Sequence, residues 1–593
     1  MTEPGEPGET WGSLLRHLRP GRRSAVALAA AIVAATVLPL LAPQLTRRFV
    51  DGAIGGAATR HLVVIALGYL AVAVAGQGAR MVTAWLASRL AWDGTNRLRE
   101  RLAEHALGLD MAYHGRRTPG EMIERVDGDV VAVAEFVVAF LLDVVASFLL
   151  VAGVLVVVFA VDPRLGGVLL VYCLLIGWGV ARAQRLAVPS AAHSRAASAA
   201  LFGNLEERLA GAEDLRANGA GEHAVYRFYE AGSAWYHAEF RAARIGSGLL
   251  AGTSVAFAAG TAIVLGLAAW SRQSGTLSVG TAVLLFQYTL MVRTPFERLI
   301  DQLRRYQTAL AGIVRIGGLL AERCTLPEPA VARELPATGP LGLELDGVGF
   351  AYPGDGERVL SDVRFTLAPG ETLGLVGRTG SGKTTIARMV LRLYDPAEGV
   401  VRVGGLDLRD VDPGSARRRM CVVTQDVQLF AASVRDNLTL FRPLADDRRL
   451  CAILAEVGLG DWLAGLPDGL DTELGGVTDV TESGGAASGV SAGEAQLLAF
   501  ARALLADPGL VVLDEAASRL DPATERSIER CVDRLLTGRT GVIISHRLSS
   551  LSRVDKIAVI ADGRVVEYGC REELVADPGS RFSRMLEMAG VPR

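Results

Sequence analysis

A phosphate-binding pattern, G-x-x-x-x-G-K-[ST], occupies residues 377–384. It follows an apolar run at 371–376 that is expected to form a strand, and helical spacing begins at Lys383. Glycines let successive backbone N–H groups turn inward onto phosphate oxygens, where the helix dipole adds positive potential. Lys383 is expected to reach the β and γ phosphate oxygens, and the Thr384 hydroxyl to bind Mg²⁺. A chance glycine-rich turn, the alternative, leaves the surrounding strand and helix unexplained. The residues expected to contact the nucleotide are Gly377, Arg378, Thr379, Gly380, Ser381, Gly382, Lys383, Thr384 and Thr385.

Two adjacent carboxylates end a second apolar strand. The run Val511-Val512-Leu513 leads directly into Asp514 and Glu515. Asp514 is suited to the magnesium side of a phosphate site, acting through water, and Glu515 to the base that orients an attacking water. Phosphoryl transfer needs positioning more than covalent chemistry. Paired acids at a strand end are otherwise usually solvated or cap a helix, so the upstream phosphate loop is what favours the catalytic interpretation.

Long apolar runs in the first half of the chain predict a membrane domain. The chain has 593 residues, 50% of them hydrophobic, and its mean hydropathy is +0.31, which is high for a soluble enzyme. This length favours at least two domains. A spanning helix needs about 20 mostly apolar residues. Six stretches qualify, namely Ser24–Pro43, His61–Ala87, Val137–Val161, Arg164–Ala181, Gly246–Trp270 and Val279–Leu299.

Arginines are distributed unequally among the connections between these stretches. They cluster before the first span and in the long segments 88–136 and 182–245, whereas the opposite side carries few, Arg47 and Arg48 among them. By the positive-inside rule, both termini and the long segments are expected in the cytoplasm of a cell-membrane protein. If each segment forms two helical arms of about 24–30 residues, a rise of ~1.5 Å per residue carries them roughly 35–45 Å from the bilayer.

Charge and cysteine content exclude two other classes of protein. The formal net charge of −3 lacks the basic footprint of a protein whose main partner is nucleic acid. The six cysteines are scattered and include no C-x-x-C pair. Neither a disulfide framework nor a zinc site is therefore expected.

The motifs of the second half occur in the order and spacing of an ABC transporter ATPase domain. They are Phe350-Ala351-Tyr352-Pro353, the phosphate loop, Val423-Thr424-Gln425-Asp426, Val490-Ser491-Ala492-Gly493-Glu494, Leu513-Asp514-Glu515, Ser518-Arg519-Leu520-Asp521 and Ile544-Ser545-His546-Arg547. With six preceding spans, the chain resembles a half-transporter of the ABC exporter type over nearly its whole length. The resemblance implies an α-helical six-span membrane domain followed by an α/β P-loop ABC ATPase domain. We expect the membrane domain at 1–323, a linker at 324–341 and the ATPase domain at 342–593.

The resemblance also assigns roles to residues that would otherwise be interpreted as ordinary packing or strand-end residues. Tyr352 resembles the aromatic residue that stacks on the adenine of ATP. Gln425 resembles the residue that touches Mg²⁺ and senses the membrane half. His546 resembles the switch histidine that contacts the γ-phosphate, and it follows an apolar strand expected at 541–544.

A second set of residues is implied to act between subunits or between domains. Ser491 and Gly493 resemble the signature residues that contact ATP bound to the partner subunit. Asp521 resembles the acid of the loop that crosses the dimer. Short helices near Tyr113–Arg117 and Glu213–Asn218 are expected to be the coupling helices, at the ends of the cytoplasmic arms.

The chain departs from the family pattern in the part of the site that it lends to its partner. The usual signature is Leu-Ser-Gly-Gly-Gln, but Ala492 and Glu494 replace its first glycine and its glutamine. The stretch 475–489 is longer than the usual glycine–acid loop, and Arg519 replaces a small residue. One phosphate loop and one signature cannot build a sandwiched site in a monomer, so a dimer is required. The lopsided departures favour a heterodimer, with a homodimer as the alternative.

Four polar residues, Arg80, Asp143, Gln287 and Arg293, lie inside or at the ends of the apolar spans. Intramembrane charge is costly and tends to face a cavity or another helix, which would suit a substrate pathway. The alternative is that the charged residues lie at the cytoplasmic edge, where arginine extends its head group into water.

Together these features predict ATP-driven alternating access, in which two ATP molecules with Mg²⁺ are sandwiched between two ATPase domains. The expected cargo is a small lipophilic or amphipathic molecule that is exported across the bilayer. Two alternatives use the same features: an importer built on the exporter architecture, and a membrane ATPase that acts as a sensor and transports nothing.

Overall fold

The structure, a computed structural model, describes residues 21–273, 278–327, 329, 331–354, 356–475, 490–515, 522–545 and 547–590. These residues form two compact units. The membrane unit comprises the described residues up to Leu107 together with Pro119–Glu322. The ATPase unit comprises Gly108–Thr118 together with the described residues from Arg323 onward.

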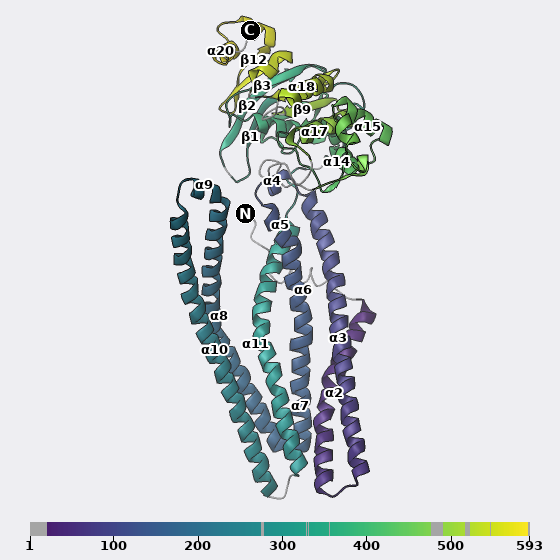
Figure 1. The fold of residues 1–593 in the computed structure, drawn as a ribbon, viewed down its shortest axis with the longest axis vertical. Coiled ribbons are helices and arrows are strands. Elements are labelled where there is room, and N and C mark those ends of the chain that lie inside the picture. Colours follow the sequence, from purple (N-terminus) through teal and green to yellow (C-terminus); the bar gives the residue numbers. More distant parts are fainter. Residues whose placement is uncertain are drawn as a thin grey trace. The chain divides into compact units, whose positions relative to one another are not determined.

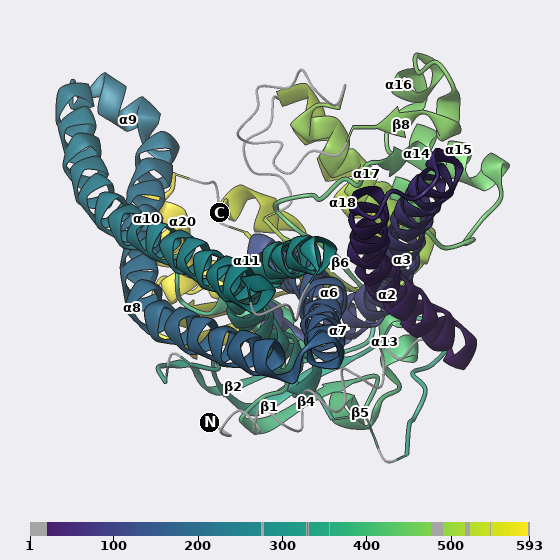
Figure 2. The same ribbon diagram turned by 90° about the horizontal axis from the view of Figure 1, so that it is seen from below.

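Long helices make up the membrane unit (Figure 1). In chain order they are α2 (Arg22–Ile54), α3 (Thr59–Gly108), α5 (Pro119–Ile123), the π-helical η1 (Glu124–Gly128), α6 (Asp129–Ala139), the π-helical η2 (Phe140–Val145), α7 (Ala146–Val161), α8 (Pro163–Ala210), α9 (Ala212–Ala217), α10 (Gly221–Gln273) and α11 (Val279–Ala321). Side-chain caps fix two of the starts, because Asp162 accepts from the Arg164 N–H at 2.8 Å and Ser278 from the Thr281 N–H at 3.2 Å. Helices α8 and α10 pack side by side and are joined by α9 (Figure 2).

Five stretches of the described helices are long and apolar enough to cross a membrane, where the sequence predicted six spans. They are Arg22–Ile54, Thr59–Gly108, Pro119–Val161, Pro163–Ala210 and Gly221–Leu267. The sixth predicted span lies in α11, which is helical but is not among them. Gln287, Arg293 and Pro295 interrupt its apolar stretch. This helix packs against α2, α6, α7, α8 and α10 and buries Leu284, Tyr288 and Val292. Six spans therefore remain a prediction.

An ion pair between a buried carboxylate and a half-exposed arginine joins α6 to α11 in the membrane unit. Asp129 is 1% exposed. Its carboxylate accepts from Arg315 through both oxygens, with the Nε–Oδ2 bond at 2.8 Å. A buried carboxylate is tolerated only when it is paired and hydrogen-bonded. The pair therefore fixes the side on which α6 meets α11.

Two sheets form the frame of the ATPase unit (Figure 1). The antiparallel sheet has the order β2 (Arg358–Leu367), β1 (Leu343–Ala351), β4 (Glu398–Val403) and β5 (Leu406–Asp407). The six-stranded sheet has the order β12 (Arg564–Cys570), β11 (Lys556–Ala561), β3 (Thr372–Val376), β10 (Thr540–Ile544), β9 (Leu510–Asp514) and β6 (Met420–Val423). Strands β11, β3, β10, β9 and β6 are parallel, and β12 pairs antiparallel at the edge. A small ribbon pairs β7 (Ala432–Ser433) with β8 (Glu473–Leu474).

Helices surround these sheets and complete two cores. They are α4 (Met111–His114), α12 (Lys383–Val390), η3 (Leu408–Asp410), α13 (Pro413–Arg419), α14 (Val434–Thr439), α15 (Asp447–Glu456), α16 (Gly460–Ala464), η4 (Gly469–Asp471), α17 (Ala492–Ala506), α18 (Pro522–Leu536), η5 (Leu548–Arg553), α19 (Arg571–Ala576) and α20 (Arg581–Met588). Every residue of β3 and β10 is buried, as is expected of strands covered on both faces. One core includes α15 and α17, and the other includes α12 and the antiparallel sheet.

The Asp129–Arg315 pair predicts a larger effect on stability than an ion pair that is exposed on both sides. We expect Arg315→Ala to lower the stability of the membrane unit by roughly 1–3 kcal/mol, because it removes both side-chain hydrogen bonds from a buried carboxylate while the 45% exposed position of Arg315 lets water replace part of them. The apparent midpoint of thermal unfolding of the purified protein measures this. Arg227→Ala is the matched control, since it breaks a pair with Glu230 whose side chains are 49% and 56% exposed. Such a pair is worth under about 1 kcal/mol. Equal shifts in the two variants would contradict the prediction.

Candidate nucleotide site

The parallel strands of the six-stranded sheet bring the predicted site residues to one edge. Strands β3, β10, β9 and β6 are neighbours that run in the same direction, so their carboxyl ends coincide. The phosphate loop follows β3, Asp514 ends β9, Ser545 follows β10, and Gln425 lies just beyond β6. Ligands of open parallel sheets bind at this edge. The strands predicted at 371–376, 511–515 and 541–544 are present as β3, β9 and β10. Because they run in the same direction, the residues at their carboxyl ends lie close together.

The phosphate loop has the backbone geometry that its glycines allow. Gly380 and Gly382 have φ of 80° and 103°. A Cβ at Gly382 would approach Leu360 to 2.6 Å, so no larger residue fits there. Lys383 is the first residue of α12, and its Nζ donates to the carbonyl oxygens of Gly377 at 2.8 Å and Arg378 at 2.9 Å. The Lys383 side chain thus bridges the two ends of the phosphate loop and stabilises its closed conformation.

The loop also carries polar groups that a bound phosphate would complement. The Ser381 Oγ is buried and has no hydrogen-bond partner among the described residues. Lys383 is 5% exposed. Burial lowers the pKa of Lys383, and the negative charges of Glu515 and Asp514 oppose that shift. An orphaned hydroxyl and a desolvated ammonium group both gain from an anion at the mouth of the loop.

The two carboxylates after β9 lie in different environments. Burial raises the pKa of Asp514, and the nearby Glu515 charge adds to this, whereas a hydrogen bond from the Thr384 hydroxyl acts in the opposite direction. Glu515 has φ of 49°, a conformation that is rare for a residue with a side chain, and its N–H donates to the Ile544 carbonyl at 3.0 Å. Strained backbone held by a neighbouring strand is common at functional sites.

The donors around Asp514 suit a hard divalent cation. Thr384 and Asp514 supply hydroxyl and carboxylate oxygens, and the Gln425 side chain is exposed at the same edge. Among the described residues, no group of three or more His, Cys, Asp or Glu side chains could hold a metal by itself. Mg²⁺ commonly takes one or two protein oxygens and completes its shell with nucleotide phosphates and water. These residues therefore fit Mg²⁺ only together with a nucleotide.

Tyr352, the residue expected to stack on adenine, follows β1 and is held in place from several sides. Its hydroxyl lies 3.0 Å from the Thr385 Oγ1 and accepts from Arg388 at 2.9 Å. Its ring meets Phe350 and Tyr394 edge to face, with centroids 4.9 Å and 5.3 Å away. Sequence reasoning missed Arg388, the residue that bonds the Tyr352 hydroxyl. Helical spacing in α12 places Arg388 one turn after Thr384, which was the available signal.

The signature residues lie at the start of α17. Ser491 is the N-cap, and its hydroxyl accepts from the Glu494 N–H at 3.2 Å, while the Glu494 carboxylate accepts from the Ser491 N–H at 2.6 Å. This reciprocal arrangement is a capping box. A Cβ at Gly493 would approach the Thr524 Cγ2 to 2.7 Å. Packing against α18 therefore requires the glycine at this position.

Several predicted residues lie outside the described residues. These are His546, Asp521, Arg519 and, except for its first residue, the stretch 475–489. The helix expected near Tyr113–Arg117 is α4, which begins two residues earlier, and the one expected near Glu213–Asn218 is α9.

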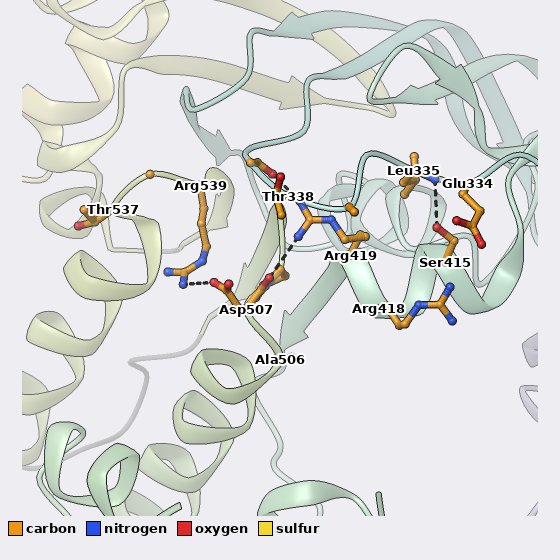
Figure 3. Close-up of a pocket in the computed structure, with 14 residues that line it drawn as sticks. Glu334, Leu335, Thr338, Ser415, Arg418, Arg419, Ala506, Asp507, Thr537 and Arg539 are labelled. Carbon is orange, nitrogen blue, oxygen red and sulfur yellow. Dashed lines mark hydrogen bonds and ion pairs between the residues drawn. The ribbon is translucent and has the colours of Figure 1, made fainter. Parts of the chain in front are cut away.

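The opposite edge of the same sheet holds a pocket of about 520 Å³ (Figure 3). It lies before the amino ends of β9 and β10, so it is separate from the nucleotide edge. Two of the three arginines that line it are engaged, because Arg419 donates to the carbonyl oxygens of Pro336 and Asp507, and Arg539 donates to the Asp507 carboxylate. These bonds anchor the segment 334–339 to the sheet.

Glu515→Gln tests the predicted base. It keeps the shape of the side chain but removes the carboxylate expected to orient water. We expect ATP hydrolysis by the purified protein to fall by about 100-fold or more, with ATP binding retained. Hydrolysis and binding of a fluorescent ATP analogue are measured on the same preparation. Glu456→Gln, at an exposed ion pair with Arg534, is the control. Hydrolysis that survives Glu515→Gln would place the base elsewhere.

Comparison with known proteins identifies both halves of the chain. Residues 26–296 match the family model described as ABC transporter transmembrane region. Residues 360–518 match the one described as ABC transporter. A lipid A-core flippase of Thiobacillus denitrificans is 30% identical over 97% of this chain and 97% of its own length. A multidrug efflux ATP-binding/permease protein of Mycobacterium bovis is 32% identical over 96% of this chain, which spans 47% of that protein.

A solved structure shares the whole fold. It is a bacterial Atm1-family ABC exporter with ATP bound, with a TM-score of 0.79 at 23% identity over 96% of this chain and 99% of that one. The fold prediction, a helical membrane domain followed by an α/β ATPase domain, is confirmed. The chain therefore belongs to the ABC transporter family, as a membrane region fused to an ATPase domain that binds ATP and couples its hydrolysis to transport.

Proposed function

We propose that this chain is one half of a dimeric exporter that moves amphipathic molecules with an acidic group across the cell membrane. The observation that carries the proposal is a charged pocket within the membrane unit, of about 510 Å³. It lies between helices that the sequence predicted as spans. The importer and the sensor are the alternatives, and the transport experiment below distinguishes them.

The pocket is lined mainly by apolar side chains of α2, α3, α7 and α11 and the adjoining η2. Three charged side chains face it, those of Arg80, Asp143 and Arg298. Asp143 accepts from Arg298 at 3.3 Å and from the Gln302 Nε2 at 2.8 Å, so its charge is compensated. Arg80 has no charged or hydrogen-bonding partner among the described residues. The net positive charge of the lining favours a cargo with an apolar body and an anionic group.

The other polar residues predicted in the spans do not line this pocket. Arg293 donates to Glu297 at 2.7 Å, an ordinary pair one turn apart on the same helix. Gln287 is on the same helix but is not part of the lining. Asp143 lies in η2, and π-helical turns within α-helices are frequent at functional sites. These contrasts support a substrate role for Arg80 and Asp143 and a structural role for Arg293.

In the proposed mechanism, ATP lies between the phosphate loop of one subunit and the signature of the other. Lys383 and the loop amides hold the phosphates, Tyr352 packs on adenine, and Glu515 orients the attacking water. Mg²⁺, held by Thr384, Gln425 and Asp514, would neutralise phosphate charge. Closure of the two ATPase domains draws the cytoplasmic arms together and opens the pocket outward, and hydrolysis resets it. Ser491, Gly493, Asp521 and His546 keep the roles that the family resemblance implies.

The altered signature supports a partner that is a different half-transporter. The Glu494 carboxylate lies at the N-terminus of α17, where the phosphates of ATP bound to the partner would approach. Its charge opposes an anion that the helix dipole otherwise attracts. The chain would then combine its own complete phosphate edge with a weak signature. The partner is expected to carry a standard signature and a replaced glutamate.

The names of the relatives favour export. The Mycobacterium bovis protein is named for multidrug efflux and the Thiobacillus denitrificans protein for flipping lipid A-core. The arginine distribution supports a cell-membrane protein with both termini and the ATPase domain in the cytoplasm. We propose a membrane domain at 1–323, a linker at 324–341 and an ATPase domain at 342–593. The compact units support this division, except that 108–118 belongs to the ATPase unit.

Transport into inverted membrane vesicles tests the cargo and the direction. We expect ATP-dependent uptake of a fluorescent long-chain carboxylic acid, and its loss in Glu515→Gln. Arg80→Gln removes the uncompensated charge and should reduce uptake of this acid by about 5–10-fold, equivalent to about 1–1.4 kcal/mol, because its anionic group loses its partner. Arg293→Gln, outside the pocket, is the matched control.

Other outcomes would contradict this proposal. Uptake only into right-side-out vesicles would indicate an importer, and ATP hydrolysis with no movement of the acid or of its amine analogue would favour a sensor. Equal loss of acid and amine uptake in Arg80→Gln would show that the residue is not selective for an anion.

ATP hydrolysis by this chain alone in lipid nanodiscs tests the heterodimer. We expect low activity alone and recovery on co-expression with a second half-transporter. Alone, the double variant Ala492→Gly, Glu494→Gln should hydrolyse ATP about 5-fold faster, as expected if about 1 kcal/mol of repulsion at the helix N-terminus is removed. Glu473→Gln, an exposed change on β8, is the control. Full activity of the unmodified chain alone would instead indicate a homodimer that tolerates its signature.

A further inference from the structure

The chain crosses between the membrane unit and the ATPase unit at three places. It enters the ATPase unit at Gly108, leaves after Thr118 and enters again at Arg323. Two segments, 108–118 and 323–327, therefore stand on the ATPase side of these crossings. Both segments are held by the side chains of Asp110, Arg392 and Tyr394. We call these three residues and the two segments the junction.

Asp110 ties the two crossing segments together. It is 8% exposed and caps α4 by accepting from the Tyr113 N–H at 3.2 Å. Its other oxygen accepts from the Thr325 hydroxyl at 2.6 Å and from the Thr325 N–H. Burial acts to raise the pKa of Asp110, but the hydrogen bonds from Thr325 and Tyr113 outweigh it and lower the pKa. The carboxylate is therefore charged at neutral pH and binds both segments at once.

The loop that follows α12 holds the same two segments. The Tyr394 hydroxyl donates to the Met111 carbonyl of α4 at 3.0 Å, and Ala112 is buried in the same core as Tyr394. Arg392 donates to the Pro327 carbonyl at 2.9 Å and to the Val411 carbonyl at 3.4 Å. Its φ is 49°, so the backbone is strained where the guanidinium turns toward the linker.

This loop is also in direct contact with the nucleotide site. Helix α12 begins at Lys383 in the phosphate loop and ends at Val390, two residues before Arg392. The Tyr394 ring packs edge to face on Tyr352, the predicted adenine residue, with centroids 5.3 Å apart. A shift of either Tyr352 or α12 on ATP binding would therefore be transmitted to Tyr394 and Arg392 through rigid contacts.

We propose that Tyr394, Arg392 and Asp110 are positioning residues that couple nucleotide binding to the membrane unit through the junction. Tyr394 and Arg392 transmit the state of the nucleotide site, and Asp110 makes α4 and the linker respond as one body. None of the three is among the residues expected to contact ATP. The inference rests on the proposed alternating access, because the movement it transmits is that of the cytoplasmic arms.

Protection of the arms from trypsin tests the junction without knowledge of the cargo. The cytoplasmic parts of α8 and α10 are rich in arginine, so cleavage there reports whether the arms are drawn together. Full-length protein in inverted vesicles is digested with and without ATP, Mg²⁺ and vanadate, and ATP hydrolysis is measured in parallel. We expect nucleotide to slow cleavage of the wild-type arms about 10-fold, as for a local opening suppressed by ligand.

Two variants each remove one bond of the junction. Tyr394→Phe keeps the ring against Tyr352 and loses the bond to Met111, and Thr325→Val loses one bond to Asp110. In each we expect protection to fall about 5-fold, the effect of one hydrogen bond. The KM for ATP and the kcat should remain near wild-type values, which distinguishes positioning from a role in the nucleotide site. Tyr568→Phe, whose hydroxyl bonds the Thr366 carbonyl, is the matched control.

Three outcomes would overturn the proposal. Wild-type protection in both Tyr394→Phe and Thr325→Val would show that the bonds transmit nothing. A changed KM for ATP together with lost protection would place the residues in the nucleotide site. Wild-type arms that ATP does not protect would overturn the alternating-access proposal itself, and the junction with it.

Discussion

The coincidence of four carboxyl ends at one edge of a buried parallel sheet is the constraint on which the ATPase unit depends. Strands β3, β10, β9 and β6 pair in parallel register, and every residue of β3 and β10 is buried, so their carboxyl ends are fixed relative to one another. The phosphate loop, Asp514 and Gln425 each follow one of these strands. A site assembled this way costs little to keep organised, because the same apolar burial that stabilises the sheet also fixes the polar groups.

Away from that edge, buried carboxylates fix the positions of helices that would move in the proposed mechanism. Asp129 and Arg315 join α6 to α11, and Asp110 joins α4 to the linker. Both carboxylates are almost completely buried, and both are held by hydrogen bonds, Asp129 from Arg315 and Asp110 from Thr325 and the Tyr113 N–H. Buried pairs contribute little net stability compared with apolar packing, but they allow only one arrangement. Such pairs suit elements that must move as rigid bodies, since a slipped arrangement would leave a buried charge without a partner.

The sequence could predict what depends on local pattern and could not predict what depends on contacts between distant residues. Continuous apolar runs identify β3 and β9, and glycine spacing identifies the phosphate loop, because both are local requirements of the backbone. The bond from Arg388 to Tyr352 joins residues 36 positions apart, and that from Arg315 to Asp129 joins residues 186 apart. No local pattern records these. The sixth predicted span shows the converse, since a helix packed against other helices can carry Gln287 and Arg293 that lower its hydropathy.

The capping box of Ser491 and Glu494 stabilises α17 within this chain, but it weakens the site that the helix would offer to ATP bound to a partner subunit. Glutamine at position 494 could accept the same bond from the Ser491 N–H without a charge, so the cap alone does not require a carboxylate. A helix N-terminus attracts anions through its unpaired N–H groups and its dipole. In this chain an internal carboxylate already occupies that position. The positive potential left for an external phosphate is therefore weaker, and the Ala492 methyl group hinders close approach to the backbone. Helix α17 is thus stabilised within its own subunit, and in the proposed dimer the loss would fall on the ATP bound to the partner subunit.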